Sequence, residues 1–104
     1  MSTFKNVTIH RAANIYFGGN VTSRKIELAD GTVKTLGIMM PGEYTFDTES
    51  SELMEITSGE LEVKLPNQDN WQVISAGDSF EIPANVKFHL KVKSLVDYCC
   101  SYFA

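Results

Sequence analysis

Apolar and polar residues alternate one by one in several separate segments, and this pattern limits the possible folds more than any other feature. From residue 86 to 93 every second residue is apolar, and the residues between them are three lysines and one histidine. Residues 60–65 and 79–82 show the same pattern. A period of two residues is typical of a β-strand with one buried face. Because no window longer than a turn or two has helical periodicity, the sequence predicts an all-β fold.

Turn-forming residues separate these segments. Glycine, proline or asparagine interrupts the chain at residues 41–42, 58–59, 66–70, 76–77 and 83–85. Asp30 and Gly31 lie between two further apolar segments, and they predict a two-residue hairpin turn of type I′. About eight short strands at this spacing predict a sandwich or a barrel.

The composition fits one domain of this kind. The chain has 104 residues, of which 43% are hydrophobic, which is enough for one core and leaves no room for a second domain. We expect residues 1–13 to form an N-terminal arm or an extra edge strand, and residues 14–104 to form the barrel domain.

The net charge and the hydropathy pattern exclude some kinds of binding partner. Thirteen acidic residues against nine basic ones give a net charge of -4, which argues against binding to nucleic acid polymers. No run of about 18 apolar residues occurs, and the first residues lack the apolar region of a secretory signal. We therefore expect no membrane partner and a cytoplasmic location. Cys99 and Cys100 are neighbours and are expected to pack in the core as free thiols.

The glycines and prolines of residues 52–92 have the spacing of a small cupin barrel. Glu52 precedes Gly59 by seven positions, and Gly77 leads to Pro83, as in the two cupin motifs. Where the second motif would place a metal-binding histidine, this chain has Phe88, and a phenyl ring cannot bind a cation. The sequence thus predicts a cupin-type, jelly-roll-like β-barrel without a metal.

Longer motifs carry a more specific resemblance. The segments MMPGEYTFDT, ELMEITSGELEVKLP, NWQV, AGDSFEIPA and FHLKV occur in this order. Together they resemble the pyrimidine/purine nucleoside phosphorylase family of small cupin-fold proteins. The resemblance implies phosphate-dependent cleavage of purine and pyrimidine nucleosides to a free base and ribose 1-phosphate. It also implies a homodimer with inorganic phosphate as co-substrate and no metal or other cofactor.

This chemistry needs a polar group near the ribose and a proton donor for the departing base. If Met54 faces the barrel interior, Glu52 faces it too and is a candidate catalytic residue that binds the ribose or stabilises its positive charge. The alternative is a solvated acid at the end of a strand. His89 is the second catalytic candidate because imidazole titrates near neutral pH. Strand alternation, however, points His89 away from Phe88.

The remaining candidates would hold the substrates. Where a typical cupin carries its first histidine pair, this chain has Glu43, Tyr44, Phe46 and Asp47, and with Phe88 these residues are expected to bind the nucleoside by stacking and hydrogen bonding. The aromatic members could instead only fill the core. Arg24 and Lys34, which flank the predicted hairpin, are the candidate phosphate ligands.

Two other functions remain open at this stage. One is a barrel that binds a sugar or another small metabolite without catalysis. The other is a metal-dependent cupin oxygenase or isomerase that uses oxygen ligands such as Asp47 and Glu52.

Overall fold

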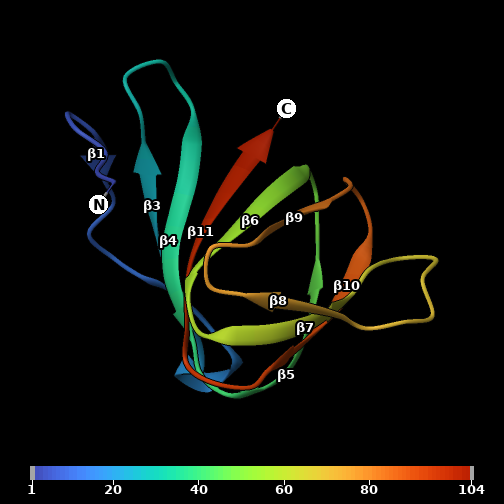
Figure 1. Ribbon diagram of the computed structural model, residues 1–104. Coiled ribbons are helices and arrows are strands. Elements are labelled where there is room, and N and C mark those ends of the chain that lie inside the picture. The colour runs from blue at the N-terminus through green and yellow to red at the C-terminus, as the bar shows by residue number, and fades with distance from the viewer. Residues whose placement is uncertain (1, 104) are drawn as a thin grey trace.

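The computed structural model describes residues 2–103, and its regular structure is β-strands apart from one 3-10 helix (Figure 1). The elements are β1 (Thr8–Ile9), β2 (Asn14–Tyr16), the 3-10 helix η1 (Phe17–Gly19), β3 (Val21–Glu27), β4 (Val33–Met39), β5 (Gly42–Asp47), β6 (Ser51–Ser58), β7 (Glu60–Lys64), β8 (Gln72–Ser75), β9 (Ser79–Ile82), β10 (Lys87–Val92) and β11 (Val96–Phe103). The all-β prediction is confirmed, although about eight strands were expected and the described chain has eleven. In this part of the chain no helix is long and apolar enough to cross a membrane.

The strands form two antiparallel sheets. The larger sheet has the order β1-β3-β4-β11-β6-β9, with β2 also beside β3, and the smaller has the order β5-β10-β7-β8. From β4 onward every connection except that between β7 and β8 takes the chain from one sheet to the other (Figure 1). This arrangement of two sheets is the cupin-type fold that the sequence predicts.

The core lies between the two sheets and is built by the alternating residues of the sequence. Leu61 and Val63 on β7 are fully buried, and on β10 Phe88 and Leu90 are at most 3% exposed. The residues between them, such as His89, are on the outer face. Removing one such aliphatic or aromatic side chain from water stabilises the fold by about 1.5–3 kcal/mol.

The hairpin between β3 and β4 differs from the predicted two-residue turn. The amide of Leu28 donates to the carbonyl of Thr32 at 2.9 Å, so the loop contains three residues, and among them only Gly31 has positive φ. The carboxylate of Asp30 accepts a hydrogen bond from the amide of Thr32 at 2.9 Å. The type I′ prediction was wrong because this side-chain bond stabilises Asp30 in an ordinary backbone conformation, and a single glycine then completes the loop.

The N-terminal segment contributes an edge strand. Thr8 and Ile9 of β1 lie opposite Glu27 and Ile26 of β3. The imidazole of His10 lies 3.1 Å from the carboxylate of Glu27. The segment is therefore joined to the larger sheet by both backbone pairing and a side-chain contact.

Cys99 and Cys100 are both buried and free, as the packing prediction expects. Since they are adjacent on β11, their side chains point to opposite faces of the larger sheet. Cys100 belongs to the hydrophobic core between the sheets. This orientation brings its thiol to the site described next.

Candidate functional site

A cavity of about 330 Å³ lies between the two sheets. Its walls come from β3, β4, β6 and β11 of the larger sheet and from β5 and β10 of the smaller sheet, and the loop that joins β5 to β6 forms part of its rim. The volume is near the lower end of the range for small-molecule sites, which is about 300 to 1,000 Å³. The cavity thus suits one small metabolite.

One wall of the cavity is aromatic and aliphatic. Phe46 and Phe88, directly opposite each other on β5 and β10, have ring centroids 5.7 Å apart and an interplanar angle of 26°. Phe17 contacts Phe46 edge-on, with the two ring centroids 5.4 Å apart. Because both cavity rings are held by neighbours, this wall offers a preformed surface to a flat apolar group.

The polar wall comes from β11, where Tyr98, Cys100 and Tyr102 all line the cavity. The Tyr98 hydroxyl donates to the carbonyl of Thr22 at 3.2 Å, and the Tyr102 hydroxyl lies 3.0 Å from the Thr35 hydroxyl. Burial raises the pKa of both phenols far above their ordinary value, so both remain neutral hydrogen-bonding groups.

The sequence did not indicate these three residues as candidates for the site, and Cys100 was expected only to pack in the core. Strand alternation groups them on one face, but it does not indicate that this face borders the cavity. Positions 98, 100 and 102 share one face of β11, and the first and last of them carry hydroxyl groups.

Glu52 lies on β6 beside this wall, in the inward orientation that alternation with Met54 predicts, and it lines the cavity with Met54. The thiol of Cys100 donates a hydrogen bond to Oε1 of Glu52 at 3.4 Å. Burial raises the pKa of the Glu52 carboxyl, and the weak thiol donor opposes this shift only in part. Among residues 2–103, no lysine, arginine or histidine forms an ion pair with Glu52.

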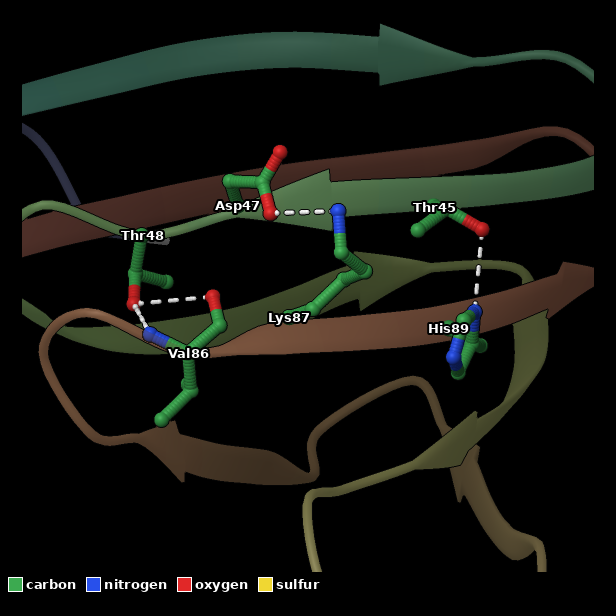
Figure 2. Close-up of polar contacts among 6 residues, drawn as sticks. All are labelled: Thr45, Asp47, Thr48, Val86, Lys87 and His89. Carbon is green, nitrogen blue, oxygen red and sulfur yellow. Dashed lines mark hydrogen bonds and ion pairs between the residues drawn. The ribbon is translucent and has the colours of Figure 1, made fainter.

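The other catalytic candidate, His89, lies outside the cavity. Its Nδ1 atom is 2.9 Å from the Thr45 hydroxyl on the outer face of the smaller sheet, as Figure 2 shows. On the same face Lys87 forms an ion pair with Asp47 at 3.0 Å. Asp47, unlike His89, also borders the cavity.

The buried hydroxyl of Thr48 fixes the rim of the cavity. It donates to the carbonyl of Pro83 at 2.7 Å and accepts from the amide of Val86 at 3.1 Å. Figure 2 shows this contact with Val86 beside the Asp47–Lys87 pair. The end of β5 and the start of β10 are therefore tied together where the cavity opens.

Tyr44 and Glu43 do not line the cavity. Tyr44 is 5% exposed and donates to the carbonyl of Met40 at 2.6 Å, and its ring packs against Phe17 and Phe46. Glu43 is exposed. Tyr44 therefore supports the aromatic wall from the side, next to Phe46 on the same face of β5.

Arg24 and Lys34 also lie away from the cavity. The Arg24 side chain donates to the carbonyl of Arg11 at 3.3 Å, and the Lys34 ammonium donates to the Ser101 hydroxyl at 2.6 Å. Within residues 2–103, no lysine, arginine or histidine lines the cavity. Of the nine site residues that the sequence predicts, the structure brings Phe46, Asp47, Glu52 and Phe88 together.

The described residues contain no group of three or more histidine, cysteine, aspartate or glutamate side chains placed to hold a metal ion. Asp47 and Glu52, the oxygen ligands considered for a metal-dependent cupin, both border the cavity but have no third partner of this kind. The arrangement provides an aromatic surface, neutral hydroxyl groups and one half-buried carboxyl group that forms no ion pair with any of residues 2–103.

The two antiparallel sheets with a cavity between them define the chain as a cupin-type protein. The solved structure of an RmlC-like cupin from Shewanella frigidimarina superimposes with a TM-score of 0.69, covering 97% of this chain and 86% of that one, at 17% identity. At this identity the likeness concerns the fold alone.

The more specific comparisons give the family. A profile described as pyrimidine/purine nucleoside phosphorylase matches residues 11–102. A protein of that name from Geotalea uraniireducens is 64% identical over 102 residues, which cover 98% of both chains. The crystal structure of an Acinetobacter protein of unknown function superimposes with a TM-score of 0.93 at 38% identity, covering 97% of this chain and 98% of that one. The chain belongs to the pyrimidine/purine nucleoside phosphorylase family.

Proposed function

We propose that this protein cleaves purine and pyrimidine nucleosides with inorganic phosphate, giving a free base and α-D-ribose 1-phosphate. Membership of the family supports the reaction class. The observation that carries the proposal is the cavity itself, in which a preformed pair of phenyl rings faces a wall of neutral hydroxyl groups. A nucleoside has the same two halves, a flat base and a polyhydroxyl sugar.

In this proposal the base packs on Phe46 and Phe88, and the ribose lies toward Glu52 and Tyr102. Stacking of a base on an aromatic ring contributes about 1–3 kcal/mol and does not depend on which hydrogen-bonding edge the base presents. An aromatic wall therefore supports a broad range of bases.

We propose Lys87 as a phosphate ligand at the rim. Within residues 2–103 it is the only cationic side chain in an ion pair with a residue that lines the cavity, namely Asp47. The Lys87 and Asp47 side chains are 62% and 72% exposed, so their pair is weak and an incoming phosphate can exchange for the carboxylate. Arg24 and Lys34 lie elsewhere and have no part in this proposal.

The test is to incubate the purified protein with adenosine or uridine and to measure the free base and ribose 1-phosphate by chromatography. Product is expected only when phosphate is present. Equal base release with and without phosphate would refute phosphorolysis. A heat-inactivated sample and a Phe46→Leu variant serve as controls.

The second candidate is a non-catalytic cupin that binds a sugar or a small metabolite, favoured by the same combination of aromatic and hydroxyl groups. Such a protein would be protected from heat by ribose or a nucleoside in a saturable manner but would form no product. Turnover and thermal protection measured on one sample separate the two functions.

We also propose that the protein acts as a homodimer in the cytoplasm. Exposed apolar side chains such as Leu36 and Phe103 on the larger sheet support self-association, and the two free cysteines fit a reducing compartment. Light scattering on a gel-filtration peak tests the dimer, and a monomer at micromolar concentration would refute it.

A further inference from the structure

We propose that Glu52 is the proton donor to the departing base, and that the thiol of Cys100 positions it for this role. This inference rests on the proposed phosphorolysis. It assigns to Glu52 the general-acid role for which the sequence offered His89 as a candidate.

The position of Glu52 fits an acid held in its protonated form. Glu52 lines the cavity, and its Oε1 atom accepts the hydrogen bond from Cys100, which leaves Oε2 as the oxygen that can carry the proton. No cation of the described chain pairs with the carboxyl to stabilise its ionised form. Burial raises the pKa of this carboxyl, as it does for general acids held in apolar pockets.

The other ionisable groups around the cavity are less suited to donate a proton. Tyr98, Cys100 and Tyr102 face Glu52 from β11, and burial raises the pKa of each far above its ordinary value, so they hold their protons too tightly. The remaining ionisable side chains of the lining, Tyr16, Asp47 and Glu49, are exposed. His89 hydrogen-bonds to Thr45 on the outer face of the smaller sheet, where it cannot contact a bound base.

The protons balance over one turnover. An oxygen of hydrogen phosphate forms a bond to C1′ of the ribose while the bond from C1′ to the base nitrogen breaks, and its electron pair moves to the base. The Glu52 carboxyl transfers its proton to a nitrogen or oxygen of the base. The proton of the hydrogen phosphate then restores the carboxyl group, so ribose 1-phosphate leaves without it and the enzyme returns to its starting state.

A proton donor matters most when the leaving group is poor, and this gives a specific test. Glu52→Gln should lower kcat with uridine by about 10² to 10⁴. With 5-fluorouridine, whose base is a stronger acid and leaves more easily, the loss should be at least tenfold smaller. Glu55→Gln is the matched control, because Glu55 lies on the same strand but is exposed on the opposite face. Glu55→Gln should have the wild-type kcat with both uridine and 5-fluorouridine.

The dependence of kcat on pH gives a second readout. It would not change if Glu52 and Cys100 had only a structural role. With wild-type protein, kcat should fall at alkaline pH as Glu52 loses its proton, and this fall should disappear in Glu52→Gln. Cys100→Ser replaces a weak donor by a stronger one that favours the carboxylate, so the alkaline fall should move to lower pH. In Cys100→Ala the side chain at position 100 can no longer donate a hydrogen bond to Glu52, so the alkaline fall of kcat should move to higher pH.

The outcomes separate the two proposals. If wild-type protein forms no base from any nucleoside, the proposed function fails. If wild-type protein is active but Glu52→Gln slows uridine and 5-fluorouridine equally, or keeps the alkaline fall, the role of Glu52 as proton donor is refuted. Unchanged pH profiles in both Cys100 variants would refute the positioning role of the thiol.

Discussion

Gly37 shows how closely the cavity wall is packed, and replacing it by alanine should both destabilise the fold and disturb the site. It lies in the middle of β4, opposite Ser23 on β3 and Tyr98 on β11. An added Cβ atom would overlap the carbonyl oxygen of Thr22 and would lie 2.6 Å from both Cζ and the hydroxyl oxygen of Tyr98. An ordinary contact needs at least 3.4 Å, so the Tyr98 ring must retreat by 3.4 − 2.6, or about 0.8 Å.

Two effects determine how much Gly37→Ala lowers the free energy of unfolding. The Thr22 carbonyl belongs to the backbone of β3 and the tyrosine ring is 7% exposed, so neither has room to move, and such overpacking costs about 1–3 kcal/mol. The new methyl group also separates the Tyr98 hydroxyl from the Thr22 carbonyl, and a lost hydrogen bond costs about 1 kcal/mol. Together Gly37→Ala should lower the free energy of unfolding by about 2–4 kcal/mol.

Urea unfolding, followed by circular dichroism and by the fluorescence of Trp71, measures this loss. With a slope of about 1–3 kcal/mol per molar urea, the midpoint should fall by roughly 0.7 M or more. Tyr98→Phe is the control, because it removes only the hydroxyl and should cost about 1 kcal/mol. If Gly37→Ala is within 1 kcal/mol of wild type, or no worse than Tyr98→Phe, the close packing described here is incorrect. Because Tyr98 lines the cavity, the variant should also have a raised KM for nucleosides.

Three further predictions concern the site. Phe46→Leu should raise KM for uridine about tenfold through lost stacking while KM for phosphate stays the same, and an unchanged nucleoside KM in steady-state assays would contradict the aromatic wall. Lys87→Gln should raise KM for phosphate at least fivefold, whereas Arg24→Gln should change it less than twofold; the reverse order would favour Arg24 as the ligand. Glu52→Gln should stabilise the protein at neutral pH. The raised pKa of Glu52 means that the native state binds the proton more tightly than the unfolded chain, so wild-type stability falls as pH rises from the ordinary glutamate range through the raised value. Thermal unfolding should therefore show a gain for the variant at pH 7 and none below about pH 4, where wild-type Glu52 is protonated in both states.

Strands with one buried face could be predicted from the sequence alone. On β10 the burial alternates without exception from Lys87 to Leu90, because one face meets the core and the other meets water. The inward orientation of Glu52 and Phe88 follows from the same regularity. The alternation of polar and apolar residues therefore predicted the site residues on strands with one buried face, namely Glu52 and Phe88.

Strand β11 shows why the rest of the site could not be predicted in this way. It is a central strand of the larger sheet, between β4 and β6, and four consecutive residues from Tyr98 to Ser101 are buried. When both faces are covered, burial no longer follows a period of two, and composition does not indicate which face borders the cavity. The positions of Tyr98 and Tyr102 depend on pairing with strands that are distant in the sequence.

The candidate phosphate ligands failed to reach the cavity for a related reason. Lys34 pairs with Ser101, and this register places both side chains on the outer face, where they hydrogen-bond. A shift of one residue would have turned Lys34 to the inner face. Nearness to a predicted hairpin gives no information about this register.

The residue that replaces the cupin histidine also bears on the acidity of Glu52, and one substitution can test this link. Phe88 and Glu52 line the same cavity, and a phenyl ring there can neither ionise nor donate a strong hydrogen bond. A histidine at position 88 would favour the Glu52 carboxylate, whether it donates a hydrogen bond or carries a charge, and it would lower the carboxyl pKa. Phe88→His should therefore move the alkaline fall of kcat to lower pH and reduce activity at neutral pH. Thermal unfolding checks that the variant is folded, and an alkaline fall at its wild-type position would show that the acidity of Glu52 does not depend on the apolar surface facing it.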